Sequence, residues 1–114
     1  MKTHTLNLNP IYFDLIKSRI KTLEGRLNDE KRRNFNIGDR ITFFKEPERN
    51  ESMDAIIIDK YLFSNFSDMV NTLNKESLGF ANATNEDVIN TYRQFYTIED
   101  ETKYGVVIFK IKVI

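Results

Sequence analysis

The sequence contains no cysteine, and its one histidine is His4. Without cysteine the chain cannot form a disulfide framework, a thiolate zinc site or a thiol nucleophile, and a reducing cytoplasm is its expected location. A single histidine excludes histidine-cluster metal sites and catalytic triads that depend on a histidine base. We therefore expect neither a metal nor a cofactor, and any chemistry would depend on Lys, Glu, Asp, Thr, Ser or Tyr.

Long apolar runs are also missing, since no stretch reaches the roughly 18 apolar residues of a membrane span and the N-terminus lacks an apolar signal-peptide run. We expect neither a membrane span nor an export signal. The composition is instead that of a folded globular domain, with 40% hydrophobic and 30% charged residues. A length of 114 residues predicts one domain that covers positions 1–114.

The 17 basic and 17 acidic residues balance, but they are unevenly distributed. Residues 1–45 contain ten lysines and arginines against five acidic residues, which leaves seven basic against twelve acidic residues in the remainder. A basic first half is compatible with an anionic ligand at one face, and it is equally compatible with an ordinary mixed surface.

Alternating apolar residues predict strands, whereas capping signals followed by helical spacing predict helices. The predicted strands cover residues 3–8, 22–27, 40–45, 53–61 and 104–114. One helix is predicted over about residues 10–20, a second with Ser67 as its N-cap, and a third after Thr84 with a capping-box-like pattern. Separate strands without a regular strand–helix–strand alternation indicate an α+β fold with a mostly antiparallel sheet.

The segments between these elements give three further expectations. Residues 28–36 are dense in charge and are predicted to be an exposed loop. Residues 99–101 are predicted to be an acidic turn before the last strand. The consecutive Ile56, Ile57 and Ile58 suggest that their strand is buried on both faces or closes a barrel.

Three charged residues stand close together where the first helical pattern gives way to an alternating one. On an extended strand, Glu24 and Arg26 point to the same face and lie roughly 7 Å apart, and the long side chain of Lys21 can reach them. Such a group is often a solvated surface feature that contributes about 0 to 1 kcal/mol. It is also a set of groups that could hold an anion or a base edge.

The run Lys21-Thr22-Leu23-Glu24-Gly25-Arg26, followed by Gly38-Asp39-Arg40-Ile41-Thr42-Phe43, resembles the G-x-K-x-x-E-x-R signature of the ASCH domain. This family, named for activating signal cointegrator homology, belongs to the PUA-like superfamily. Residues 61–66, 95–101 and 104–107 resemble further blocks of the family, so the likeness covers nearly the whole chain. The chain departs from the signature at Arg19, where the family usually has glycine.

The resemblance implies a PUA-like β pseudo-barrel with two or three flanking helices, and binding of RNA or a nucleotide in a cleft. Carried onto this chain, it places Lys21, Glu24 and Arg26 in the cleft, with Arg19 nearby. The aromatic residues that could stack on a base, and that could equally be core packing, are Tyr61, Phe63, Tyr96 and Tyr104. The basic run of Lys31, Arg32 and Arg33 is a candidate nucleic-acid contact or a solvated loop.

Two other functions are compatible with the sequence. Some small bacterial members of the family resemble amidohydrolases of N4-acetylcytidine that use a lysine and a threonine three residues later. Lys21 matches the lysine, but Glu24 stands at the threonine position, and Thr22 is the hydroxyl on the same strand face. A protein-interaction module is the third possibility. The physiological ligand, the RNA sequence and the oligomeric state are not encoded in any pattern of the sequence.

Overall fold

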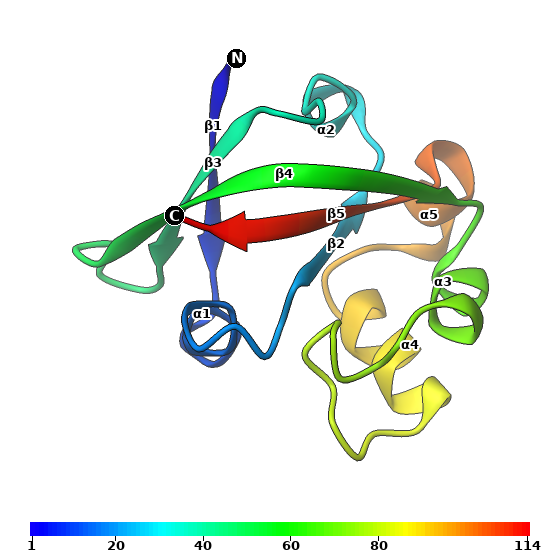
Figure 1. Ribbon diagram of the computed structural model, residues 1–114. Coiled ribbons are helices and arrows are strands. Elements are labelled where there is room, and N and C mark those ends of the chain that lie inside the picture. The colour runs from blue at the N-terminus through cyan, green and yellow to red at the C-terminus, as the bar shows by residue number, and fades with distance from the viewer.

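A five-stranded curled sheet forms the centre of the molecule in the computed structural model, which describes residues 1–114 (Figure 1). The strands are β1 (Thr3–Leu8), β2 (Leu23–Leu27), β3 (Arg40–Lys45), β4 (Ser52–Phe63) and β5 (Val106–Val113). Their spatial order is β1-β3-β4-β5-β2, so β1 and β2 are the two edges. Only the β1–β3 pair is parallel. The predicted mostly antiparallel α+β fold is therefore confirmed.

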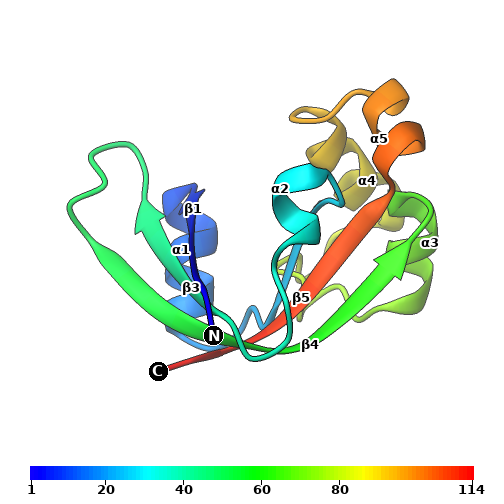
Figure 2. The ribbon, with the colours of Figure 1, turned by 90° about the horizontal axis from the view of Figure 1, so that it is seen from above.

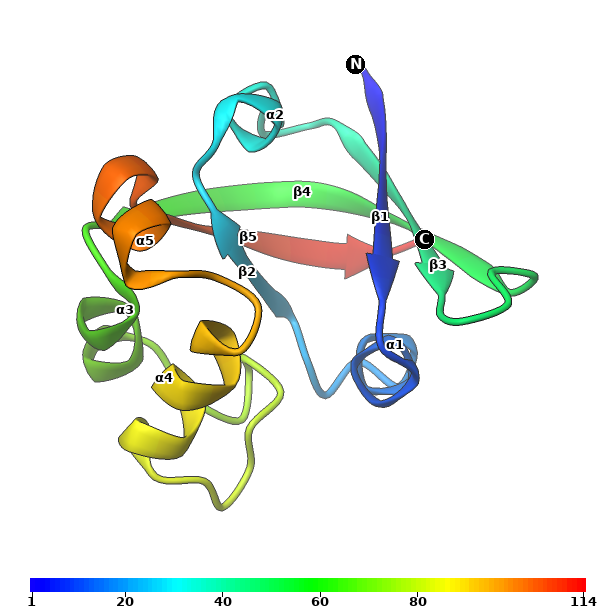
Figure 3. The ribbon, with the colours of Figure 1, turned by 180° about the vertical axis from the view of Figure 1, so that it is seen from behind.

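Five helices pack around this sheet: α1 (Pro10–Lys17), α2 (Glu30–Arg33), α3 (Phe66–Thr72), α4 (Asn85–Arg93) and α5 (Ile98–Tyr104). Figure 2 shows α1 beside β1 and β3, whereas α3, α4 and α5 group around the other end of the sheet. The view from behind in Figure 3 shows the space between these two groups, with β2 running behind it. None of the helices is long and apolar enough to cross a lipid bilayer.

Two hydrophobic clusters hold the sheet and helices together, and β5 contributes to both. Because side chains alternate along a strand, Val107, Phe109 and Ile111 belong to the cluster that α1 covers, while Val106 and Ile108 belong to the cluster that α3 and α4 cover. Helices therefore lie on both faces of the sheet. Strand β2 pairs with β5 at the boundary between the two clusters, and this places its charged residues between α1 and α4.

Two helix starts that the sequence predicts are present. Asn9 caps α1 by accepting a hydrogen bond from the amide of Ile11, and proline occupies the first turn. Thr84 and Asp87 form a reciprocal capping box at the start of α4. The first helix ends at Lys17, earlier than the predicted residue 20, because the chain turns through a left-handed residue at Arg19.

The segment 28–36 is not simply an exposed loop, as predicted, because Asp29 caps the short helix α2 and Phe35 is fully buried. The N-cap of α3 is Asn65 rather than Ser67. Residues 99–101 lie within α5 rather than in a turn, since Thr97 caps that helix and its first turn carries the acidic residues.

The expectation that β4 is buried on both faces was wrong. Ile57 is fully buried, but Ile58 is 44% exposed, because the register of β4 against β5 shifts between Ile57 and Asp59. Such a bulge turns the following side chains to a different face of the strand. Strand β4 also extends to Phe63, and β5 begins at Val106 because Tyr104 belongs to the preceding helix.

Candidate functional site

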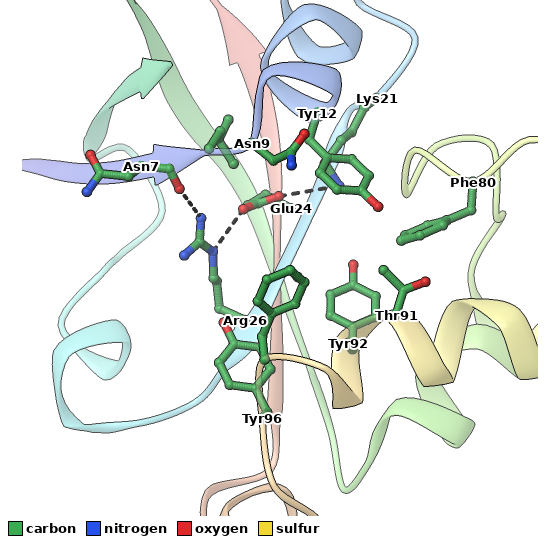
Figure 4. A pocket seen from close by; sticks show the side chains of 13 residues that line it. Asn7, Asn9, Tyr12, Lys21, Glu24, Arg26, Phe80, Thr91, Tyr92 and Tyr96 are labelled. Atoms are coloured by element: carbon green, nitrogen blue, oxygen red, sulfur yellow. Dashed lines mark hydrogen bonds and ion pairs between the residues drawn. The ribbon is translucent and has the colours of Figure 1, made fainter. Parts of the chain in front are cut away.

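A pocket of about 190 Å³ opens between the β1–α1 segment and α4, with β2 as its floor (Figure 4). Its lining combines a small group of charged side chains with several aromatic rings. The 13 lining residues are Asn7, Leu8, Asn9, Tyr12, Lys21, Glu24, Gly25, Arg26, Phe80, Thr91, Tyr92, Phe95 and Tyr96.

The floor of the pocket is an ionic triad centred on Glu24. Arg26 Nε donates to Glu24 Oε2 at 2.9 Å, and Lys21 Nζ lies 3.3 Å from Glu24 Oε1. The Lys21 and Glu24 side chains are almost completely buried, and the Arg26 side chain is 15% exposed. The alternation of β2 puts Glu24 and Arg26 on one face, which explains why residues two apart in sequence form an ion pair.

Lys21 is bound on all sides by the protein. Its Nζ donates to the carbonyl oxygens of Leu23 at 2.7 Å and Leu78 at 2.6 Å, in addition to its contact with Glu24. An ammonium group has three N–H donors, so these three acceptors use all of them. Lys21 therefore neutralises Glu24 and connects β2 to the turn that contains Leu78, and no donor is left for a ligand.

Arg26 is the cation with hydrogen-bonding capacity to spare. Besides the Glu24 contact, its Nη2 donates to the carbonyl oxygen of Asn7 at 3.1 Å. Two of the five guanidinium N–H groups are used in these bonds, which leaves three for a ligand. Since Asn7 lies on β1 and Arg26 on β2, this side chain also links the two edge strands of the sheet.

The three charges set one another's ionisation. Burial lowers the pKa of Lys21, although the Glu24 carboxylate opposes this effect. Burial alone would raise the pKa of Glu24, but the charges of Arg26 and Lys21 outweigh it and hold that pKa below its ordinary value. Burial alone would lower the pKa of Arg26, but the Glu24 carboxylate outweighs this effect, and the pKa of Arg26 is raised. Glu24 is thus ionised at neutral pH and acts only as a hydrogen-bond acceptor.

Aromatic rings form the wall opposite the triad. Tyr92 stacks on the buried Phe66 with ring centroids 4.6 Å apart, and Phe80 lies between Tyr92 and Tyr12 at centroid distances of 5.8 and 5.6 Å. Burial raises the pKa of Tyr92 well above its ordinary value, so its hydroxyl stays protonated and can donate a hydrogen bond. Phe95, in contrast, is 69% exposed at the rim.

Gly25 allows this wall to approach the floor closely. A Cβ atom at position 25 would lie 2.8 Å from the Tyr92 hydroxyl oxygen and 3.0 Å from Ile108 Cδ1. Any larger residue would push α4 away from β2 or fill part of the pocket. The glycine between Glu24 and Arg26 therefore sets the distance between the ionic floor and the aromatic wall.

The candidate residues from the sequence divide into two groups. Lys21, Glu24, Arg26 and Tyr96 line the pocket together. Arg19 and Thr22 lie outside it, at a second hollow. Tyr61 is also outside, because its hydroxyl donates to Asp59 Oδ2 at 3.0 Å and its ring packs against the cluster under α3 and α4.

The remaining sequence candidates do not line the pocket either. Phe63 and Tyr104 pack against the same cluster as Tyr61. The basic run of Lys31, Arg32 and Arg33 lies on α2. Arg32 pairs there with Asp29 at 3.0 Å, and Arg33 Nε donates to the carbonyl oxygen of Asn28 at 2.9 Å.

Sequence reasoning did not identify most of the pocket wall. Tyr12, Tyr92 and Phe95 fall at a spacing that is typical of helical core positions, Asn9 reads as a helix cap, and Asn7, Phe80 and Thr91 carry no pattern of their own. The one available signal was the density of aromatic residues at positions 92, 95 and 96, at the end of α4 and just after it. No group of three or more histidine, aspartate or glutamate side chains is arranged to hold a metal ion.

The sequence model of the ASCH domain family matches residues 6–114. The crystal structure of hypothetical protein PH0355 is similar to this chain, with 36% sequence identity, a TM-score of 0.87 and coverage of 100% of both chains. The solution NMR structure of protein PF0455 from Pyrococcus furiosus is 34% identical, with a TM-score of 0.74, over 100% of this chain and 98% of that chain. None of the curated proteins matches the sequence significantly.

Proposed function

Because this chain belongs to the ASCH domain family, whose members are generally thought to bind RNA, we propose that it binds single-stranded RNA or a nucleotide and holds one unpaired base in the pocket. Proteins that read RNA by sequence mostly take up unstacked bases, which they stack on aromatic rings and hydrogen-bond along their edges. The pocket offers both kinds of contact.

The observation that carries the proposal is the buried Glu24–Arg26 pair facing aromatic rings. The carboxylate can accept a hydrogen bond from a ring or exocyclic N–H group, and the free guanidinium N–H groups can donate to a carbonyl oxygen or ring nitrogen beside it. A planar heterocycle carries such donors and acceptors side by side along one edge. Tyr92 and the exposed Phe95 supply flat surfaces on which its faces can stack.

The dimensions of the pocket also favour a single base. Pockets for drug-sized ligands measure about 300 to 1,000 Å³. The volume here is about 190 Å³, which suits one ring system rather than several. A base inside a duplex could not enter, so the proposal specifies unpaired RNA or a free nucleotide.

The geometry favours binding over hydrolysis of N4-acetylcytidine. A lysine-activated hydroxyl needs a free amine close to the nucleophile, but the donors of Lys21 are used by Leu23, Leu78 and Glu24. Thr22 does not line the pocket. Release of acetate from N4-acetylcytidine, lost in a Lys21→Ala protein that circular dichroism shows to be folded, would establish the catalytic alternative. Because the sequence lacks cysteine, we also propose that the protein is located in the cytoplasm.

The test compares two exposed apolar residues, one at the pocket rim and one outside the lining. Phe95 lies at the pocket rim and is 69% exposed, whereas Leu62 is 62% exposed and distant from the lining. Neither change to alanine opens a core cavity, so both variants should fold. Stacking of one base is worth about 1 to 3 kcal/mol, and Phe95→Ala should weaken RNA binding by that amount while Leu62→Ala leaves it unchanged.

Fluorescence anisotropy with a labelled single-stranded oligonucleotide measures both affinities, and the same sequence as a duplex serves as the competitor. Arg26→Ala should also weaken binding by about 1 to 3 kcal/mol, with circular dichroism confirming that the variant remains folded. Equal affinity of wild type and Phe95→Ala, or preference for the duplex, would contradict the proposal.

A further inference from the structure

A second hollow, of about 210 Å³, lies where the end of α1 meets the end of β5. It shares only Lys21 with the main pocket. Its floor is apolar and its rim is cationic, and no aspartate or glutamate lines it. Besides Lys21, the lining consists of Ile16, Arg19, Thr22, Ile111, Lys112 and Val113.

Arg19 stands in this rim in a backbone conformation that suits glycine better. Its φ angle is 68°, in the left-handed region that costs most residues about 1 to 2 kcal/mol. The turn is fixed by hydrogen bonds from the amide of Arg19 to Ile16 and from the amide of Ile20 to Leu15. Strained residues of this kind are concentrated at functional sites, and together with its place at the hollow this makes the Arg19 side chain a candidate ligand group.

The polar groups around the hollow are free to bind a ligand. Arg19 uses one N–H group, on Nη1, to donate to the carbonyl oxygen of Lys17 at 2.8 Å, which leaves four. The main chain of Thr22, which lines the hollow, is held between Ser77 and Ile111 by hydrogen bonds of 3.0 Å. Lys112 is exposed beside them, while Lys21 contributes only its methylene chain because its ammonium is bound elsewhere.

We propose that this hollow is a second ligand site, which binds the phosphate group of an organic phosphate. A planar guanidinium fork, an ammonium group and a hydroxyl donor are the groups that bind phosphate oxygens, and no aspartate or glutamate stands among the lining residues. The partly exposed Val113 would contact the organic part of the ligand. The proposal does not depend on what the main pocket binds, because the two sites use different side chains.

The two possible sources of such a phosphate, a small metabolite and a nucleic-acid strand, are separated by the choice of probe. We would follow backbone amide signals by NMR while adding inorganic phosphate, adenosine monophosphate or a short single-stranded RNA at constant ionic strength. With any probe that binds, the amide signals of Arg19, Thr22 and Lys112 should shift together. A response to inorganic phosphate and the mononucleotide assigns the site to small molecules, and a response to RNA alone assigns it to a strand.

Matched variants decide whether the arginine binds the ligand. Arg19→Gly removes the side chain and relaxes the backbone, so it should fold normally and bind each responding probe at least about fivefold more weakly. Arg49→Gly is the control, because Arg49 has a φ angle of 60°, is exposed and does not line the hollow. Lys112→Gln should weaken binding, whereas Lys110→Gln, on the same strand but outside the lining, should not.

Unchanged affinity in Arg19→Gly, or equal losses in Arg19→Gly and Arg49→Gly, would overturn the proposal. Amide shifts centred on α2 or on the main pocket, with the signals of Thr22 and Lys112 unaffected, would also overturn it. The absence of any shift with all three probes would do the same.

Discussion

At the scale of single residues, the two cations beside Glu24 have different roles. Lys21 is enclosed by acceptors from the protein, and its aliphatic chain packs against the Gly79 turn, where a Cβ atom would lie 3.0 Å from Lys21 Cδ. Arg26 reaches the pocket with unused donors. Removing one partner of a buried ion pair typically destabilises a protein by about 3 to 5 kcal/mol, so loss of Lys21 would act through folding rather than through ligand contact.

Arg19 provides a stability prediction. Arg19→Gly should raise the free energy of unfolding by about 0.5 to 1 kcal/mol, because relief of the left-handed strain exceeds the entropy that glycine adds to the unfolded chain. Urea denaturation followed by circular dichroism measures the change. Arg49→Gly, at a φ angle of 60°, should behave similarly, although it also loses a surface ion pair with Glu46. A destabilised Arg19→Gly protein would mean that the arginine side chain stabilises the turn more than the strain costs.

The charged part of the site could be predicted from the sequence because its members are neighbours on one strand. Glu24 and Arg26 are two residues apart, and strand alternation is enough to place them together. The aromatic wall could not be predicted in the same way. Tyr92 and Phe80 reach the triad only because α3 and α4 pack on β2 and β5, and this long-range packing leaves no local pattern in the sequence.

At the scale of secondary-structure elements, Asp39 holds the N-terminal strand against the rest of the sheet. Its Oδ2 accepts hydrogen bonds from His4 Nε2 at 2.8 Å and from the amide of Asn36 at 3.0 Å, and its Oδ1 accepts from the amide of Lys2 at 3.0 Å. The His4 ring also stacks on Phe35, with centroids 3.9 Å apart. One carboxylate thus connects β1, the turn after α2 and the start of β3.

This arrangement predicts a loss of stability in acid. The hydrogen bonds from His4, Lys2 and Asn36 hold the pKa of Asp39 well below its ordinary value, so the folded state binds this proton less readily than the unfolded chain. The stabilisation is complete above the unfolded pKa of about 4 and is lost as the pH falls toward the folded value. Thermal unfolding of wild type and Asp39→Asn between neutral pH and about pH 3 measures this contribution.

The Asp39→Asn protein should be less stable than wild type at neutral pH, and the difference should shrink as the pH decreases. The His4 side chain pairs with Asp39, so the comparison is repeated in the His4→Gln background, where this pair is absent. Parallel curves for wild type and Asp39→Asn across the whole range would show that Asp39 does not contribute through its charge.

The elements themselves were largely predictable, and the errors have physical causes. Strand β3 and the capping box of α4 follow from local patterns, and the half-barrel agrees with the PUA-like fold that the resemblance to ASCH domains implied. The short helices α2 and α5 were missed because their sequences are mostly charged and show no apolar pattern. Each is stabilised by one cap and one buried residue, which is Phe35 for α2 and Glu101 for α5. Glu101 is buried because it accepts hydrogen bonds from the amide of Phe66 and from Arg93, partners that are distant in sequence.

At the scale of the whole molecule, the balanced charge limits how RNA can be bound. With 17 basic and 17 acidic residues, and with eight of the basic side chains already paired with carboxylates, about half of the cations are left to neutralise phosphates. Affinity should therefore depend on base contacts more than on the electrostatic term that dominates for strongly basic proteins.

The salt dependence of binding measures this balance. Each neutralised phosphate of a single strand contributes about −0.7 to the slope of log K against log salt concentration, so two or three contacts give a slope of about −1.5 to −2. Anisotropy titrations over a range of salt concentrations provide the value, with Lys31→Ala, at an exposed lysine without an ion pair, as a comparison that should mainly reduce the slope. A slope of about −4 or steeper would indicate an extended phosphate-binding surface instead.

The position of β5 in the sheet has a consequence for how the protein is made. Strand β5 is the last strand in chain order, yet it lies between β4 and β2 and is the only strand that pairs with β2 (Figure 1). During synthesis, residues 23–27 would leave the ribosome long before their partner does. Glu24 and Arg26 therefore cannot take up their final positions until residues 106–113 have emerged from the exit tunnel, and until then β2 and both hydrophobic clusters remain accessible to chaperones.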